Sequence, residues 1–468
     1  MYQTTMKLKY FLPEGTGILF ILFLLLLTSC SIIHPYQRPA DIADNHLYRN
    51  SNITDTNSMG KLPLNSLFRD SILQSLLNEG IRNNTDLKIA VTRIKSASAA
   101  FKQSKQALLP SLNLTANPVF QNIPAQLGVP QTYQLYAGAA WEADLWGKLK
   151  SAKRASLLLL LQSEAYKRAV QTQLVADIAS NYFLLMAYDE QLQITEKTVA
   201  NRKEEVETMK ILKESDVVTG AAVVQSQANR YSVEITIPDL KQHIHELENA
   251  ISILLGKTPD TLVRSKLQDQ KITVQLQTGL PIELLANRPD IQEAELQLRS
   301  SLEMENVARA YFYPTLSLTA NAGLVNTGIA QFFSPSSFFA NLSGNLIQPL
   351  FSQGQNQQRL EIAKANSEAN LISFRKSLLT AGQEVSDALY SYQTAVEKES
   401  LRLQQISYLQ KSVDYTKELL NYSSKANYTD VLTSEQSLLA AQLNSISDKL
   451  QELTSVVNLY RSLGGGWK

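Results

Sequence analysis

The residue with the most distinctive chemistry in this sequence is Cys30, the only cysteine among 468 residues. It follows the small residues Thr28 and Ser29 and the apolar run 18–27, and two lysines lie upstream of that run. Ten apolar residues are too few to cross a bilayer as a helix, but they match the core of a signal peptide. We therefore expect residues 1–29 to be a lipoprotein signal peptide, cleaved before an acylated Cys30.

A plain signal peptide with an incidental cysteine is the alternative interpretation of this segment. Lipidation is preferred because the sole cysteine stands at the one position that acylation requires. Ser31 follows it in place of an acidic residue, and the commonest sorting rule then permits transport to the outer membrane. A single cysteine also excludes a disulfide within the chain.

The other reactive side chains do not form a recognisable catalytic or metal site. His243 and His245 lie among Gln and Glu residues, without a cysteine or carboxylate cluster at metal-ligand spacing. Nothing resembles a nucleophile elbow, a phosphate-binding loop or a zinc motif. We therefore expect no metal, no other cofactor and no enzymatic activity.

The composition favours long helices and gives no sign of a nucleic-acid partner. Lys and Arg number 44 and Asp and Glu number 43, so the net charge is close to zero. Such a balance provides no positive surface for a phosphate backbone. Gly and Pro are scarce, at 18 and 15 residues, which allows long uninterrupted helices.

The chain contains an internal repeat whose two copies are offset by 204 residues. Asp86 and Asp290 keep the same offset as Pro110 and Pro314, and a Leu-Thr-Ala-Asn run follows each proline. This period is far longer than the few dozen residues of a solenoid unit. The pattern indicates a duplicated half-protein in which each copy reads as a helix, a proline and an alternating strand.

Each repeat is expected to contain a helix, a β-hairpin, a long helix and a returning helix. In the first repeat, 66–256, we expect them at 86–108, 111–142, 148–214 and 221–255. In the second repeat, 281–463, we expect them at 290–311, 315–347, 355–423 and 428–463. The remaining segments are a lipid-anchored arm at 30–65, a linker at 257–280 and a C-terminal tail at 464–468.

Local signals refine these elements. A first short helix is expected over 65–82, and Pro238 is expected to kink the returning helix. Asp290, with Glu293 three residues later, is expected to cap its helix in the manner of a capping box. The charged residues between 204 and 214 are expected to be solvated.

The hairpins and long helices together indicate a channel. Each long helix would measure about 100 Å, and each strand alternates apolar with polar residues, as in Leu112-Asn113-Leu114-Thr115. Four strands are too few for a membrane barrel, which begins at about eight. Strands pooled between subunits would close one, with apolar faces towards lipid. A four-stranded sheet capping a soluble helical stalk is the alternative.

Four stretches then connect the chain to a known family; they are residues 35–39, 141–148, 280–291 and 459–467. Through them the chain resembles the TolC-like outer-membrane factors of tripartite efflux pumps, in the lipoprotein branch called NodT or OprM-like. The resemblance implies an α+β membrane protein. Duplicated helical hairpins would form a periplasmic α-barrel, and four strands from each subunit of a homotrimer would form a twelve-stranded outer-membrane β-barrel.

The same resemblance implies partners and a passive role. A periplasmic adaptor protein would join the trimer to an inner-membrane pump of the resistance-nodulation-division type, which supplies the energy. The trimer would be a conduit for small molecules, embedded in outer-membrane lipid. A lipid-anchored helical scaffold without a pore and a soluble periplasmic enzyme are the competing functions.

The resemblance also places a gate at the turns that end the long helices. Asp430 falls where the family often has an acidic residue, and trimerisation would make it a ring. Tyr422 and Lys425 stand where links to neighbouring helices would form, and Asp216 would add a carboxylate from the first turn, where Ala222 occupies the position matching Asp430. The alternative role of Asp430 is a helix-start carboxylate favoured by the macrodipole.

Two tryptophans complete the predicted sites. Trp141 and Trp146 flank the point where the first hairpin leaves the expected membrane region. Aromatic residues concentrate at the interfaces of membrane barrels, so both are expected to be interfacial anchors.

Overall fold

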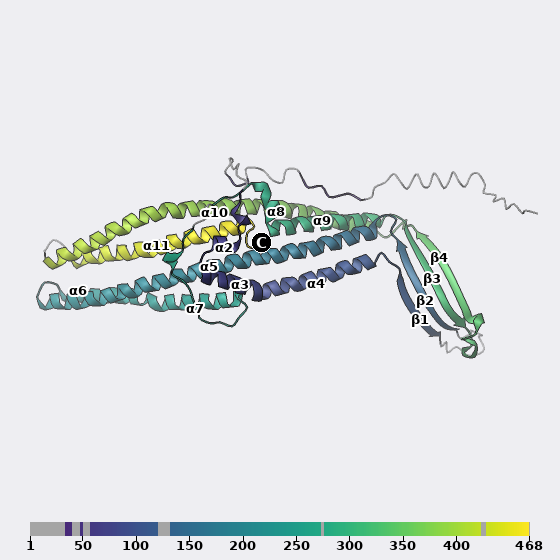
Figure 1. Ribbon diagram of the computed structural model, residues 1–468, viewed down its shortest axis with the longest axis horizontal. Helices are drawn as coiled ribbons and strands as arrows, with labels where there is room; N and C mark the ends of the chain where they lie inside the picture. Colours follow the sequence, from purple (N-terminus) through teal and green to yellow (C-terminus); the bar gives the residue numbers. More distant parts are fainter. Residues whose placement is uncertain are drawn as a thin grey trace, which may run out of the picture. The chain divides into compact units, whose positions relative to one another are not determined.

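The computed structural model describes residues 33–39, 47–49, 57–119, 132–272, 276–422 and 427–467 (Figure 1). They divide into two units, each of which draws on both sequence repeats. The first unit contains residues 99–158 and 298–370 and the described arm up to Arg38. The second unit contains the described residues of 39–98, 159–297 and 371–468.

Four antiparallel strands form one sheet in the first unit; they are β1 (Ser111–Val119), β2 (Thr132–Ala143), β3 (Thr315–Asn326) and β4 (Phe338–Ile347). Their order in space, β1-β2-β3-β4, follows the sequence (Figure 1). The two hairpins are joined where β2 pairs with β3, for example at Ala137 and Ala322. Among the described residues, β1 and β4 therefore each have one edge without a partner strand.

The register gives the sheet one apolar face and one mainly polar face, on which Tyr136 and Phe339 are in ring contact. Leu112, Ala139, Ala320 and Leu342 are aligned across the four strands, and the two leucines are exposed. The adjacent row is polar: Asn113, Gly138, Asn321 and Asn341 are aligned, and the Asn321 Nδ2 donates to Asn341 Oδ1 over 3.1 Å. The alternation predicted from the sequence thus separates the two kinds of side chain.

The junction between the hairpins depends on Gly323. A Cβ placed there would lie 2.2 Å from the carbonyl oxygen of Leu135 and 2.4 Å from the Cα of Tyr136, both backbone atoms of β2. A Gly323→Ala substitution should cost about 3 kcal/mol, the upper end for overpacking, because backbone cannot swing aside. The matched Gly344→Ala substitution should cost less, since its Cβ meets only the Leu318 Cδ2 at 3.2 Å. Thermal unfolding in detergent measures both, and equal shifts would contradict the prediction.

The two longest helices match the predicted ones closely. They are α5 (Lys148–Glu214) and α10 (Gln355–Tyr422). The returning helix of the second repeat is α11 (Tyr428–Ser462), whereas that of the first repeat is divided into α6 (Gly220–Glu234) and α7 (Thr236–Leu254). Among the described helices, none combines the length and the apolarity needed to traverse a bilayer.

The division between α6 and α7 confirms the irregularity expected at Pro238. The helix is interrupted at Ile235. A proline ring clashes with the carbonyl group four residues earlier, which here belongs to Glu234, the last residue of α6. The interruption therefore lies one turn before the proline and not at it.

The short helix expected over 65–82 is instead two helices, so this expectation was wrong in detail. They are α2 (Leu64–Leu67) and α3 (Ser71–Asn83), and a short 3-10 turn, η1 (Met59–Lys61), precedes them. Asp70 separates the two helices because its Oδ1 accepts hydrogen bonds from the backbone N–H groups of Ile72 and Leu73. A carboxylate in this position satisfies the free donors at a helix start.

The remaining elements connect these parts. The helices before the two hairpins are α4 (Thr85–Gln106) and α9 (Pro289–Ala310). The linker contains η3 (Leu267–Asp269), and the second repeat begins with η4 (Pro281–Glu283) and α8 (Leu284–Asn287). Two further 3-10 turns, η5 (Ile329–Gln331) and η6 (Pro335–Ser337), lie between β3 and β4.

The capping role predicted for Asp290 with Glu293 was also wrong. Helix α9 begins at Pro289, so Asp290 lies inside its first turn. Its two oxygens accept from the Nε and Nη2 of Arg288, over 3.0 and 2.6 Å, while Glu293 accepts from Gln162 over 3.5 Å. The reason is that a buried guanidinium needs a carboxylate partner, and Asp290 is the adjacent carboxylate that supplies it.

Ion pairs fix the lateral order of the helices in the second unit. Helix α5 contacts α6 through Lys203 and Glu234, and contacts α11 through Arg202 and Glu435. Helix α11 contacts α10 through the pairing of its Asp448 with Arg402, over 2.9 Å. The order is therefore α6, α5, α11, α10 (Figure 1). The two outer helices carry exposed aromatic and aliphatic side chains; they are Val224 and Tyr231 on α6, and Tyr408 and Tyr415 on α10.

Candidate functional site

The end of α5, the start of α6, the end of α10 and the start of α11 share one apolar cluster within the second unit. Met209 of α5 and Tyr428 and Leu432 of α11 are buried at its centre. Partly buried side chains pack around them; they are Leu212, Val218, Val223 and Leu420. We call these seven residues the turn cluster. It packs the ends of α5, α6, α10 and α11 against one another. The described gate residues adjoin these packed helix ends.

A buried ion network lies one to two helical turns from this cluster. The Arg202 side chain is 2% exposed, and its Nη1 contacts Glu205 Oε2 at 3.0 Å and Glu435 Oε2 at 2.6 Å. Lys417 of α10 contacts the other oxygen of Glu435 at 2.6 Å. These four residues, the turn ion network, join three helices.

Electrostatics make this network sensitive to the loss of any member. Burial raises the pKa of Glu205, the charge of Glu435 raises it further, and Arg202 and Lys417 oppose both effects. Two carboxylates therefore share one buried guanidinium, and Lys417 balances the second charge. Sequence reasoning missed this site, because Glu205 lies in the charged stretch that was expected to be solvated. That expectation was wrong for Glu205, although Glu207 and Lys210 are exposed.

Asp430 occupies the first turn of α11 as part of a capping box. Its backbone N–H donates to Asn427 Oδ1 over 3.1 Å, and its Oδ2 accepts from the Asn427 backbone N–H over 2.9 Å. This contact is the alternative role of Asp430, that of a helix-start carboxylate. The carboxylate is nevertheless exposed, so its role in a gate stays a prediction.

Two of the other predicted gate residues, Asp216 and Tyr422, lie beside the ends of the long helices. Asp216 follows the end of α5 with a left-handed φ of 55°, and its N–H donates to the Lys213 carbonyl over 3.1 Å. Tyr422 is the last residue of α10, and its side chain is exposed. Lys425 lies outside the described residues. The structure thus brings Asp216, Tyr422 and Asp430 to the turns without a direct contact among these three.

Both predicted interfacial tryptophans are fixed by hydrogen bonds within the first unit. The Trp141 Nε1–H donates to the Leu108 carbonyl over 3.0 Å, and that side chain is 37% exposed. The Trp146 Nε1–H donates to the Pro314 carbonyl over 2.7 Å, and its ring packs on Tyr313 with centroids 5.1 Å apart. Trp146 therefore joins the two repeats beside the proline that precedes β3. Cys30 lies outside the described residues.

Charged residues attach the linker to the helices of the second unit. Arg264 donates from Nε and Nη2 to the two oxygens of Asp189 in α5, over 2.5 and 2.8 Å, and from Nη1 to Glu248 in α7. These hydrogen bonds raise the pKa of Arg264. The hydroxyl of Tyr182 donates to Asp70 over 2.8 Å, and Gln270 donates to the same oxygen over 2.9 Å.

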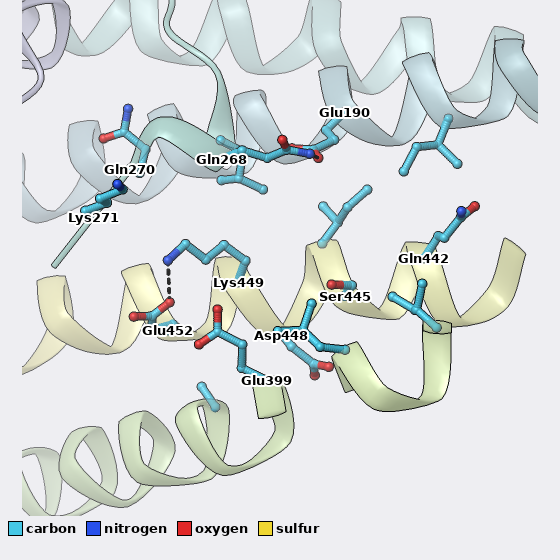
Figure 2. Close-up of a pocket in the computed structure, with 16 residues that line it drawn as sticks. Glu190, Gln268, Gln270, Lys271, Glu399, Gln442, Ser445, Asp448, Lys449 and Glu452 are labelled. Atoms are coloured by element: carbon cyan, nitrogen blue, oxygen red, sulfur yellow. Dashed lines mark hydrogen bonds and ion pairs between the residues drawn. The ribbon is translucent and has the colours of Figure 1, made fainter. Parts of the chain in front are cut away.

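A cavity of about 580 Å³ lies between α5, the linker, α10 and α11 (Figure 2). Most of its carboxylates already have partners: Glu452 pairs with Lys449 at 2.6 Å, and Glu190 accepts from Gln268 at 2.5 Å. Over the described part of the chain, no three His, Cys, Asp or Glu side chains gather as metal ligands would. His243 stacks on Tyr188, with ring centroids 5.2 Å apart.

These features belong to a known family. A family model described as outer membrane efflux protein matches residues 76–257 and 280–465, which is most of the chain. The probable efflux pump outer membrane protein TtgC of Pseudomonas putida is 29% identical over 458 residues, covering 94% of each chain. The cation efflux system protein CusC of Escherichia coli is 28% identical over 452 residues, covering 94% of this chain and 97% of CusC.

A solved structure supports the same fold. The MtrE outer membrane channel of Neisseria gonorrhoeae, in its open state, has a TM-score of 0.84 at 24% identity, covering 94% of this chain and 99% of MtrE. The α+β architecture expected from the sequence is thereby confirmed. The resemblance expected from the four sequence stretches is confirmed by the family model as well, and the chain belongs to the outer membrane efflux protein family.

Proposed function

We propose that three copies of this chain form a passive exit channel that carries small molecules from the periplasm across the outer membrane. The unpaired edges are the observation that supports it most. Within the described residues, the sheet ends at β1 and β4, and the helical layer ends at α6 and α10. Head-to-tail pairing of such edges generates a ring. Three copies would pool twelve strands, with the leucine row towards lipid and the asparagine row towards water.

The proposal includes an anchor, partners and a division of the chain. Residues 1–29 would be removed, Cys30 would carry the lipid, and the segment 30–65 would be the arm. The two repeats, the linker and the tail would keep the boundaries expected above. TtgC and CusC are named as parts of efflux systems, which supports an inner-membrane pump of the resistance-nodulation-division type and a periplasmic adaptor as partners. No residue is assigned a catalytic role.

Electrophoresis without heating and planar-bilayer recordings on the purified protein test this function. We expect a trimer that dissociates on heating and a small, stable conductance. A Cys30→Ala chain should remain in outer-membrane fractions, because a barrel would hold it there, whereas a lipid-anchored scaffold without a pore would be released. A monomer with no conductance would contradict the channel.

The proposed gate makes a separate prediction about Asp430. A ring of three exposed carboxylates narrows the path for ions, so Asp430→Ala should raise the conductance and lower the preference for cations. Asn427→Ala removes the same capping box at a cost of about 1 kcal/mol but leaves the charge. If Asp430 acts only as a helix cap, the two substitutions should change the conductance equally. Asp216, Tyr422 and Lys425 remain proposed gate residues of the same turns.

A further inference from the structure

The arm that follows Cys30 is docked on α9 through the side chain of Asn306. The Asn306 Oδ1 accepts from the backbone N–H of His34 over 3.0 Å, and the Asn306 Nδ2 donates to the His34 carbonyl over 3.2 Å. Asn306 is only 3% exposed. Its amide therefore binds both polar backbone atoms of one arm residue, His34, as a neighbouring strand would.

Two further contacts in the first unit extend this docking. Gly147 has a φ of +74°, and a Cβ there would lie 2.8 Å from the Ile33 Cδ1, so the glycine leaves room for the isoleucine. The guanidinium of Arg299, two turns before Asn306, lies 5.6 Å from the ring centroid of Tyr36. Such a cation–π contact adds to the hydrogen bonds. The arm thus follows α9 from its C-terminal part towards its N-terminal part.

We propose that Asn306 is an arm-docking residue that sets the level at which the acylated N-terminus enters the membrane. The proposal rests on the proposed lipidation of Cys30. Cys30 precedes Ile33 by three residues, and three extended residues span at most about 11 Å. The acyl chains must therefore enter the bilayer close to Gly147, where α5 begins beside Trp146. The lipid and the base of the sheet then share one membrane level.

A nitroxide on a His34→Cys variant tests this docking in the full-length protein in liposomes. The substitution preserves the two backbone hydrogen bonds, and the His34 side chain is exposed. Acylation occupies Cys30, so one label per chain is expected; two labels would refute lipidation without bearing on the docking. We expect the spectrum of an immobilised nitroxide. The accessibility of this nitroxide to oxygen and to aqueous nickel should be typical of the membrane–water boundary.

Adding Asn306→Leu should release the arm and raise the mobile fraction of the label about tenfold, because two hydrogen bonds are lost. Adding Ser301→Ala is the matched control, since that buried α9 hydroxyl donates only to the Leu298 carbonyl. If Asn306→Leu fails to fold, Asn306→Asp retains the acceptor, loses the donor and should release the arm partly. A label that is mobile beside Asn306, or that stays immobile in both Asn306 variants, would overturn the proposal.

Discussion

Replacing Arg288 by methionine is expected to destabilise the protein by about 3 kcal/mol, near the lower limit for breaking a buried ion pair. The Arg288 side chain is 5% exposed and contacts Asp290 at 2.6 Å and Glu384 at 2.7 Å. Its Nη1 also donates to the carbonyl of Ser462 over 3.0 Å. Methionine fills a similar volume but leaves both carboxylates and the carbonyl without this donor. The effect stays near the lower limit because Asp290 and Glu384 retain some solvent access.

The matched control is Arg461→Met. Arg461 contacts the same Glu384 at 3.3 Å but is 25% exposed, and a solvated pair of this kind contributes about 0–1 kcal/mol. Arg288→Lys should behave like Arg288→Met, because an ammonium cannot replace the fork of donors. Thermal unfolding of the detergent-purified proteins measures all three. Equal effects of Arg288→Met and Arg461→Met would show that burial of Arg288 is unimportant.

The same interaction predicts a pH dependence. Burial alone would raise the pKa of Asp290, but the hydrogen bonds and charge of Arg288 outweigh it and hold this pKa below its usual value. A depressed carboxyl pKa stabilises the fold above the unfolded-state pKa of about 3.9 and loses that contribution as the pH falls further. The melting temperature of the wild-type chain should fall over this acidic range more steeply than that of Arg288→Met. Parallel pH profiles of the melting temperature for the two proteins would contradict the assignment of the Asp290 pKa shift to Arg288.

Replacing Arg202 by methionine is expected to open the turns and raise the conductance of the channel. Arg202 supplies the ion pair that joins α5 to Glu435 of α11. Its loss leaves Glu205 and Glu435 buried near each other, and among the described residues Lys417 is then the cation paired with Glu435. Breaking a buried ion pair costs about 3 kcal/mol of free energy. This cost corresponds to about a hundredfold change in the ratio of joined to separated turns. Bilayer recordings should therefore show a conductance shifted towards the open level.

The adjacent Lys203 provides the control. Its pair with Glu234 joins α5 to α6 at 3.6 Å, but the lysine is 56% exposed, so Lys203→Met should leave the conductance nearly unchanged. Glu435→Gln should resemble Arg202→Met, because it removes the acceptor that links α11. Folded Arg202→Met trimers with wild-type conductance would show that the turn ion network does not restrain the channel.

Local patterns in the sequence predicted much of the secondary structure. The absence of Gly and Pro from 148–214 predicted α5, because each of these residues would have broken its hydrogen-bond pattern. Alternation around Leu112 and Leu342 predicted strands with two unlike faces, and the register confirms that each apolar row is continuous. The irregularity at Pro238 was predictable for the same reason, since proline restricts the backbone wherever it occurs.

The tertiary structure alone decided which charges are buried and which chain segments meet. Arg288 and Glu384, Arg202 and Glu435, and His34 and Asn306 are far apart in sequence. No local pattern distinguishes these residues from solvated ones, so Glu205 was expected in water and Asp290 at a helix cap. Secondary-structure propensity and hydrophobic periodicity depend on neighbours along the chain, so both can be recognised in the sequence. Burial of a charge depends on helices packing side by side, and its cost is offset only by a partner that the fold supplies.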